Sequence, residues 1–396
     1  MAHVHPGDKR HPTRHNARVL YLDLPVGDHF GWGVCGKYIA REMALLTPLR
    51  LLTAKLDSAH VSDEFELHRL KQLLPPTGDA IQDVPNNQLL QAIAGSHLAP
   101  IHPNLKGRHT VGYTVFEDSR LKPEAIETAR QRYDIVATGS SWCTKVLRDH
   151  GLEKVATVIQ GIDPAIFFPH EPPRRHFPDR FLVFSGGKFE FRKGQDLVIR
   201  AFKVLQDRHK DAFLVTAWYN QWGFSWETMK LSPHIRFAPQ SNQYFDALNQ
   251  VLTDNGVDPA RCINLAPRPN QTFANIYRNT DVGLFPNRCE GGTNLVLMEY
   301  MAAARPVIAT NSTGHADIVT SDNALVIGSP TTTSIRGQDG STTADWPEPN
   351  LEQTIEQLEF AYQNRDRLNE LATRAATDLA PLTWAKTAEE FLKLLV

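Results

Sequence analysis

Short apolar runs alternate with amphipathic stretches through the first part of the chain. Runs with the length and composition of buried strands lie at residues 18–24, 49–56, 110–116 and 135–138. Stretches with helical spacing lie at residues 37–46, 123–132 and 141–150. Because strands that alternate with helices form a parallel sheet covered on both faces, this part of the chain is expected to be an α/β domain.

The same pattern restarts after residues 161–173, where four prolines and a turn predict an interdomain linker. The second half opens with a strand at 181–185, a loop with glycines and lysines, and a helix at 195–207. Further strands are predicted at residues 213–217, 263–265, 282–285, 307–309 and 324–327. We therefore expect an α/β protein of two Rossmann-like, doubly wound parallel-sheet domains, at residues 17–170 and 174–380.

The ends of this pattern differ from its body. Residues 1–16 are polar, lack the apolar core of a signal peptide and are expected to form a disordered tail. Residues 329–350 are rich in Ser, Thr, Gly, Asp and Pro without periodicity, which predicts a surface loop. Helices are expected at 351–360 and 365–379, and residues 381–396 carry a last helix whose apolar stripe should pack.

Length and charge limit the function classes. A chain of 396 residues suits two large domains, and a net charge of −2 gives no support to nucleic acid binding. The four cysteines lie far apart without a C-x-x-C pair, which argues against a zinc site or a disulfide framework and favours a cytoplasmic protein. No apolar run is long enough to cross a bilayer, and the basic cluster at Lys9, Arg10 and Arg14 is too small to decide peripheral membrane contact.

Candidate chemistry is densest between residues 285 and 310, where Glu290 and Glu299 flank a small-residue turn. Gly291 and Gly292 allow close approach of the backbone to a ligand, and Thr293 or Asn294 can cap the following helix. The free N–H groups of that helix would face a phosphate, while the two carboxylates accept hydrogen bonds from ribose and hexose hydroxyls. The alternative is an ordinary capped helix at residues 295–304 with Glu299 in solvent.

Two other glycine-bearing loops follow predicted strands. Gly31, Gly33 and Gly36 spell G-x-G-x-x-G, but six residues separate them from the strand, so they suit a wall of a ligand site or a simple turn better than a dinucleotide fingerprint. Lys188 and Lys193, with Arg192 adjacent, lie where a doubly wound sheet neutralises phosphates. The alternative for these cations is a solvated basic turn.

With these residues assembled, the chain resembles the retaining nucleotide-sugar glycosyltransferases of family 4. The most specific part is E-G-G-T-N-L-V-L-M-E-Y-M-A-A-A-R-P-V-I-A-T at residues 290–310, supported by K-F-E-F-R-K-G at 188–194 and G-I-D-P-A-I-F-F-P at 161–169. The resemblance implies the GT-B architecture, in which the two domains face a central cleft. It also implies a last helix that crosses back onto the N-terminal domain.

The resemblance assigns roles residue by residue. Lys188 and Lys193 would hold the diphosphate of a UDP, GDP or ADP sugar, and Arg192 is a donor-binding candidate because it is adjacent to them; Glu290 would face the sugar hydroxyls and Glu299 the ribose. Backbone donors would come from Gly291, Gly292, Thr293 and Asn294, and Gly31 and Gly33 would line the cleft. The expected reaction moves a hexose to a carbohydrate or other hydroxyl acceptor. It proceeds by same-face attack, with no cofactor and no metal, since the chain has no D-x-D pair.

Two departures from the family pattern bear on this expectation. Eight residues separate Glu290 from Glu299 where seven are usual, so the turn must bulge or one glutamate must change role. Phe116 stands where many members have a histidine, and the adjacent Glu117 is a candidate to orient the acceptor or assist proton movement. The alternative for Glu117 is a surface carboxylate or a helix cap. The alternatives are an NAD(P)-dependent oxidoreductase that uses residues 31–36, and a non-catalytic sugar-nucleotide-binding protein.

Overall fold

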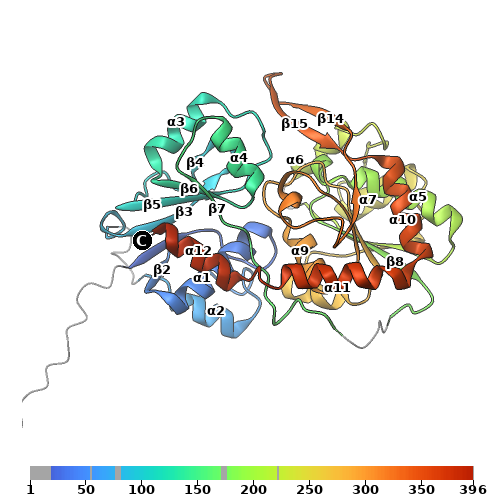
Figure 1. The fold of residues 1–396 in the computed structure, drawn as a ribbon, viewed down its shortest axis with the longest axis horizontal. Helices are drawn as coiled ribbons and strands as arrows, with labels where there is room; N and C mark the ends of the chain where they lie inside the picture. The colour runs from blue at the N-terminus through green and yellow to red at the C-terminus, as the bar shows by residue number, and fades with distance from the viewer. Residues whose placement is uncertain (1–18, 54–55, 76–81, 171–175, 221–222, 396) are drawn as a thin grey trace, which may run out of the picture.

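The chain contains two parallel β-sheets with helices on both faces (Figure 1). The computed structural model describes residues 19–53, 56–75, 82–170, 176–220 and 223–395. The predicted disordered tail lies outside the described residues. The two sheets confirm the predicted α/β class and use different orders of strands.

The N-terminal sheet has the order β2-β1-β3-β5-β6-β7, with β4 antiparallel to β3. Its order changes direction at β1, the switch point at which doubly wound sheets bind ligands. Its strands are β1 (Leu20–Asp23), β2 (Leu49–Leu51), β3 (Gln88–Ala94), β4 (Ala99–Pro100), β5 (His109–Thr114), β6 (Ile135–Thr138) and β7 (Val155–Thr157). Its helices are α1 (Gly31–Leu46), α2 (Glu64–Lys71), α3 (Pro123–Arg132) and α4 (Ser141–Asp149).

The C-terminal sheet has the order β10-β9-β8-β11-β12-β13, and its switch point lies between β8 and β11. Its strands are β8 (Phe181–Gly186), β9 (Ala212–Ala217), β10 (Cys262–Asn264), β11 (Val282–Phe285), β12 (Val307–Thr310) and β13 (Leu325–Ile327). Its helices are α5 (Gln195–Arg208), α6 (Gly223–Trp226), α7 (Tyr244–Asp254), α8 (Phe273–Tyr277), α9 (Leu295–Ala302), α10 (Leu351–Gln363) and α11 (Leu368–Leu379).

The central strand of the N-terminal sheet was not predicted. Strand β3 pairs with both β1 and β5, although its sequence Q-L-L-Q-A-I-A was assigned to loops. It contains one β-branched residue, Ile93, and two glutamines, so neither alternation nor strand propensity marks it. Gln91 is buried and bonded to Asp23 Oδ2 at 3.1 Å, which is how a glutamine is tolerated in the middle of this sheet.

The first glycine segment is helical rather than a loop. Helix α1 begins at Gly31, so Gly33 and Gly36 lie in its first turns. A Cβ on Gly36 would lie 2.0 Å from the carbonyl oxygen of Pro25, and one on Gly33 would lie 3.0 Å from Gly27 N. These glycines therefore let α1 pack tightly against the preceding loop.

The expected surface loop at residues 329–350 is instead an antiparallel hairpin of β14 (Thr331–Arg336) and β15 (Thr342–Glu348). Its threonines favour extended backbone, and Ala344 and Trp346 alternate with more exposed positions along β15. The Trp346 indole donates to the carbonyl oxygen of Glu117 at 2.7 Å, and Arg120 contacts Asp345. The hairpin thus ties the C-terminal domain to the N-terminal domain.

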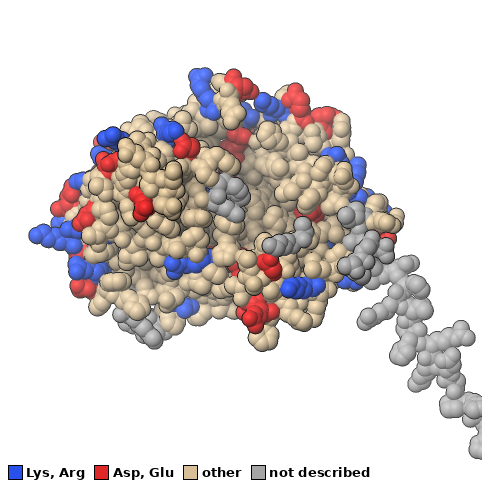
Figure 2. Space-filling view, turned by 180° about the vertical axis from the view of Figure 1, so that it is seen from behind, with Lys and Arg blue, Asp and Glu red and all other residues tan. Residues whose placement is uncertain are grey.

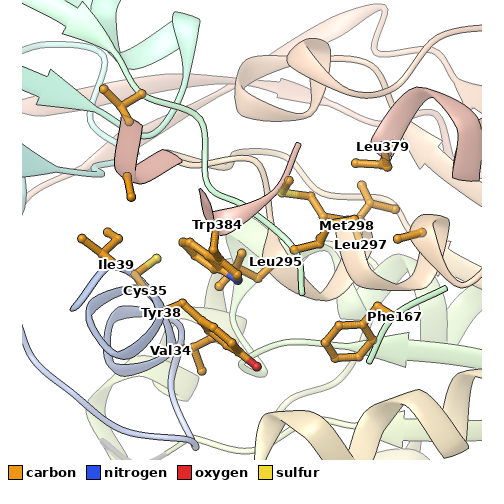
Figure 3. Packing of buried hydrophobic residues seen from close by; sticks show 14 of the residues in the cluster. Val34, Cys35, Tyr38, Ile39, Phe167, Leu295, Leu297, Met298, Leu379 and Trp384 are labelled. Carbon is orange, nitrogen blue, oxygen red and sulfur yellow. The ribbon is translucent and has the colours of Figure 1, made fainter. Parts of the chain in front are cut away.

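The last helix, α12 (Trp384–Leu395), packs against α1 (Figure 1). The rings of Tyr38 and Trp384 are stacked with centroids 5.3 Å apart, and Figure 3 shows this pair beside Leu295 of α9. One buried apolar cluster therefore includes residues from α1, α9 and α12. Among the described residues, we find no helix with the length and apolarity needed to cross a bilayer.

Lysines and arginines are scattered among acidic residues on the face shown in Figure 2. This mixture agrees with the near balance of 42 basic and 44 acidic residues in the chain.

Candidate functional site

A cavity of about 690 Å³ lies between the two sheets. Its N-terminal wall comes from the loops after β1, β3 and β5, and its C-terminal wall from the loops after β8, β9, β10 and β11. All of these loops leave the carboxyl ends of parallel strands, and the cavity meets the switch points of both sheets. The fold therefore gathers here the loops that the sequence singled out.

The loop after β8 supplies three of the cations that line the cavity, Lys188, Arg192 and Lys193. Lys188 Nζ lies 3.0 Å from Glu190 Oε1, and Lys193 Nζ lies 2.5 Å from Glu290 Oε1. Gly194 ends this loop with a φ of 73°, and a Cβ there would lie 2.0 Å from the carbonyl oxygen of Pro286. A glycine at this position thus brings the lysine loop against the chain that follows β11.

Arg192 joins three carboxylates from both domains. Its guanidinium lies 2.9 Å from Glu190, 3.2 Å from Glu290 and 3.2 Å from Glu117. Glu117 follows β5, so this contact crosses the cavity. The predicted cations and the predicted acceptor-side glutamate therefore form one charge network, and the alternative of a solvated basic turn is wrong.

The charge network keeps Glu290 ionised. Burial opposes its ionisation, but the nearby charges of Lys193 and Arg192 outweigh burial and lower the pKa of Glu290 to about 2. Burial also lowers the pKa of Lys193, against the raising effect of Glu290. The Asn287 amide donates a further hydrogen bond to Glu290 Oε1. Without a ligand, the carboxylate thus has the partners that a sugar and a diphosphate would compete for.

The two glycines after Glu290 both approach the opposite domain, and one of them also lines the cavity. A Cβ on Gly291 would lie 2.4 Å from the carbonyl oxygen of Phe116, and one on Gly292 would lie 2.9 Å from Gln160 Oε1. The Ser140 hydroxyl donates to the carbonyl oxygen of Gly291 at 2.6 Å. Gly292 lines the cavity and Gly291 does not, so Gly291 belongs to the contact between domains.

Helix α9 begins without the predicted side-chain cap. Asn294 occupies the N-cap position, but its side chain lies 3.2 Å from His315 Nε2, and the Thr293 hydroxyl donates to Met298 Sδ. Asn294 has a left-handed backbone with φ of 64°, which asparagine tolerates better than most residues. The chain turns at this position into the helix that carries Glu299. Asn294 lines the cavity and Thr293 does not.

Glu299 points into a buried polar pocket and is only 4% exposed, so the alternative of a solvated carboxylate is wrong. The Asn270 amide donates to its Oε1 at 2.6 Å, and the Tyr277 hydroxyl to its Oε2 at 3.2 Å. Burial raises the pKa of Glu299 to about 8, although both hydrogen bonds favour the charged form. The two glutamates of the motif therefore differ in charge state near neutral pH.

The N-terminal wall receives Gly31 and Glu117 but not Gly33. Gly31 is the first residue of α1 and has open space where a Cβ would be. Phe116, at the position of the family histidine, is buried, and its backbone contacts the turn at Gly291. Glu117 and Asp118 are the polar residues of this segment that line the cavity.

Sequence reasoning missed Asn270, Tyr277 and Arg288. Asn270 follows the strand at residues 262–264, a position that could have marked it as a cavity residue. Tyr277 and Arg288 gave no such signal, because their partners are distant in sequence. Arg288 is fully buried and pairs with Asp196 at 2.8 Å and Glu348 at 2.7 Å.

Comparison with known proteins places this site in a family context. Residues 179–335 match the family described as "Glycosyl transferases group 1". A D-inositol 3-phosphate glycosyltransferase from Paenarthrobacter aurescens (strain TC1) is 23% identical over 382 residues, which cover 92% of this chain and 83% of that protein. The lipopolysaccharide core biosynthesis mannosyltransferase LpcC from Rhizobium leguminosarum bv. viciae is 28% identical over 183 residues, or 44% of this chain and 46% of that protein.

Two solved structures resemble the whole chain. A sucrose-phosphate synthase from Thermosynechococcus elongatus has a TM-score of 0.64 at 13% identity, over 95% of this chain and 97% of that chain. Anabaena Alr3699/HepE in complex with UDP and glucose has a TM-score of 0.63 at 14% identity, over 96% of this chain and 99% of that chain. The predicted GT-B fold is confirmed by these similarities. The predicted enzyme class, a glycosyltransferase, is confirmed by the family match and the named relatives.

Within the described ranges, no group of three or more His, Cys, Asp or Glu side chains is placed to hold a metal ion.

Proposed function

We propose that the protein is a retaining glycosyltransferase that moves a hexose from a nucleotide-diphosphate sugar to an acceptor hydroxyl without a metal. The observation that carries the proposal is the meeting of Lys188, Arg192 and Lys193 with Glu290 and Glu299 in one cavity between two Rossmann-like domains. Three cations suit a diphosphate, and carboxylates suit the hydroxyls on either side of it. Solved neighbours in complex with UDP and with UDP-glucose support a nucleotide-sugar donor.

The cations would assist departure of the diphosphate. As the glycosidic bond breaks, negative charge grows on the leaving phosphate, and cations already held in place stabilise that charge without rearranging. Lys193 and Arg192 are held in place by Glu290 and, for Arg192, also by Glu190 and Glu117. When a diphosphate also binds to these cations, the Glu290 carboxylate can still accept hydrogen bonds from the sugar hydroxyls.

Same-face attack requires no nucleophile from the protein. The acceptor hydroxyl would lose its proton to the leaving phosphate, and Glu117 lies on the opposite wall where it can orient the acceptor. No cofactor enters this reaction. Turnover is therefore expected to survive a chelator, and loss of activity in EDTA that Mg²⁺ or Mn²⁺ restores would contradict the metal-independent part of the proposal.

The geometry does not support the oxidoreductase alternative, because Gly33 and Gly36 pack against the preceding loop.

A measurement of turnover distinguishes the non-catalytic alternative from the proposal. We expect hydrolysis or transfer from a UDP, GDP or ADP hexose in the wild type, and a loss of about 100-fold or more in Glu290→Gln. Glu352→Gln, at an exposed position of α10, is the matched control. NMR of the product should show the anomeric configuration of the donor.

The outcomes separate the hypotheses. Equal turnover in the wild type and Glu290→Gln would remove Glu290 from the reaction. Binding of a nucleotide sugar without turnover in any variant would favour the non-catalytic alternative. An inverted product would refute the retaining mechanism while leaving glycosyl transfer in place.

A further inference from the structure

Next to Glu299 lies an unused hydrogen-bond acceptor that sequence reasoning did not anticipate. Asn270 begins a short 3-10 turn, Asn270–Thr272, in the loop after β10, and lines the cavity. The residue is 9% exposed, and its Oδ1 is buried without a hydrogen-bond partner in the described part of the chain. Buried polar atoms normally have partners, so this oxygen is a site where a ligand donor is missing.

The orientation of the Asn270 amide is fixed by its neighbour. Its Nδ2 lies 2.6 Å from Glu299 Oε1 and donates to it, so Oδ1 is the atom that is left over. The backbone N–H of Asn270 donates to the carbonyl oxygen of Asp28 at 2.9 Å, across the cavity. The residue is thus held through its backbone and through its side-chain amide, and its Oδ1 remains without a partner beside the Glu299 carboxyl group.

We propose that Asn270 and Glu299 form a paired acceptor for the two neighbouring hydroxyls of the donor ribose, with Asn270 Oδ1 taking one hydroxyl and Glu299 the other. This inference rests on the proposed function, because it takes the ligand to be a nucleoside diphosphate. A vicinal diol offers two O–H donors on adjacent carbons, and each finds an acceptor in this pair. Asn270 is therefore a specificity-determining residue for ribose over deoxyribose.

The pairing explains why both residue types are needed. A second carboxyl group in place of Asn270 would share this buried site with Glu299, and two carboxyl groups that share a site do not readily ionise together. The amide donates to Glu299 through Nδ2 and still offers one acceptor through Oδ1, which an alkyl side chain cannot do. A ligand that lacks the matching hydroxyl would leave a buried acceptor unpaired, which is the basis of strong discrimination between close analogues.

The test is a calorimetric titration of UDP, GDP and ADP, each with its 2′-deoxy and 3′-deoxy form, into the wild type, Asn270→Ala and Asn275→Ala. Asn275 is an exposed asparagine of α8 that does not line the cavity, so it is the matched control. In the wild type, we expect at least one deoxy form to bind about 10-fold or more weakly than the ribonucleotide. In Asn270→Ala, the ribonucleotide should weaken by a similar factor, while the deoxy form that lacks the hydroxyl bound by Asn270 should change little.

This double comparison separates recognition from a general structural role. If Asn270 only supported Glu299, the substitution would weaken the ribonucleotide and both deoxy forms alike, and that result would overturn the inference. Equal wild-type affinity for ribonucleotides and deoxy forms would also overturn it, while the proposed function would stand. Failure of all three ribonucleotides to bind the wild type would instead refute the nucleotide-sugar site itself.

Discussion

Arg288 gives the sharpest prediction about what holds the site together. It lies two residues before Glu290, and its side chain and that of Asp196 are both fully buried. The guanidinium makes two bonds to Asp196, at 2.8 and 2.9 Å, and two to Glu348, each at 2.7 Å. It also lies 3.7 Å from the centre of the Phe191 ring. One side chain thus joins the lysine loop, helix α5 and the hairpin.

Arg288→Met keeps much of the length of the side chain but removes its charge. Asp196 would then be left buried without its cation, a change that costs about 3–5 kcal/mol in comparable sites. For a domain of about 200 residues, each kcal/mol lowers the Tm by about 2–4 °C, so the expected decrease is about 6–20 °C. Thermal unfolding followed by near-UV circular dichroism measures it.

The control is Arg374→Met, which removes an exposed arginine paired with Asp378 on α11. Exposed pairs contribute about 1 kcal/mol or less, so its Tm should fall by no more than about 4 °C. The combined Arg288→Met and Asp196→Asn variant should recover part of the loss, because no buried charge then remains unpaired in that position. A Tm for Arg288→Met within about 2 °C of the control would refute the reasoning.

Two further predictions concern the buried glutamate and the hairpin. The pKa of Glu299 is raised from 4.5 to about 8, so the folded state holds an extra proton between these values and wild-type stability should fall as pH rises through that window. In Glu299→Gln this decrease in Tm between pH 6 and pH 9 should be smaller than in the wild type, and equal pH dependence in both would contradict it. Arg120→Ala and Asp345→Ala each remove one exposed interdomain contact and should cost about 1 kcal/mol or less. Since both remove the same contact, the double variant should cost little more than the larger single change, and full additivity would show that the two residues act independently.

Local sequence patterns predicted the strands and helices whose structure is determined by their own sequence. The strand at 181–185 and the helix at 195–207 were predicted nearly to the residue, because a charge-free apolar run and an amphipathic period are properties of the segments themselves. Strand β3 was missed because its burial comes from its central place between β1 and β5. The hairpin was missed for a related reason: its order depends on contacts with Glu117 and Arg120, more than two hundred residues away in the chain.

In the candidate site too, some residues could be predicted from the sequence and others could not. Its cations and glutamates were identified from motif spacing, and the structure brings them into one cavity. Their partners were not identified, since the interaction of Arg192 with Glu117 and that of Glu299 with Asn270 depend on how the loops meet. The glycines at 291 and 292 were assigned to ligand approach; Gly291 instead lies against Phe116 of the other domain, while Gly292 lines the cavity beside Gln160.

The central claim is that the cations after β8 bind the diphosphate of a nucleotide sugar. Calorimetric titration of UDP, GDP and ADP into the wild type, Lys193→Ala and Lys203→Ala tests it most directly, because Lys203 is a surface lysine paired with Asp207 outside the cavity. Loss of a charge-assisted contact corresponds to about 1.5–3 kcal/mol, or about 10- to 150-fold in affinity. We predict that at least one nucleotide binds the wild type and Lys203→Ala equally and binds Lys193→Ala at least 10-fold more weakly. Unchanged affinity in Lys193→Ala, or no binding of any of the three nucleotides to the wild type, would contradict the claim.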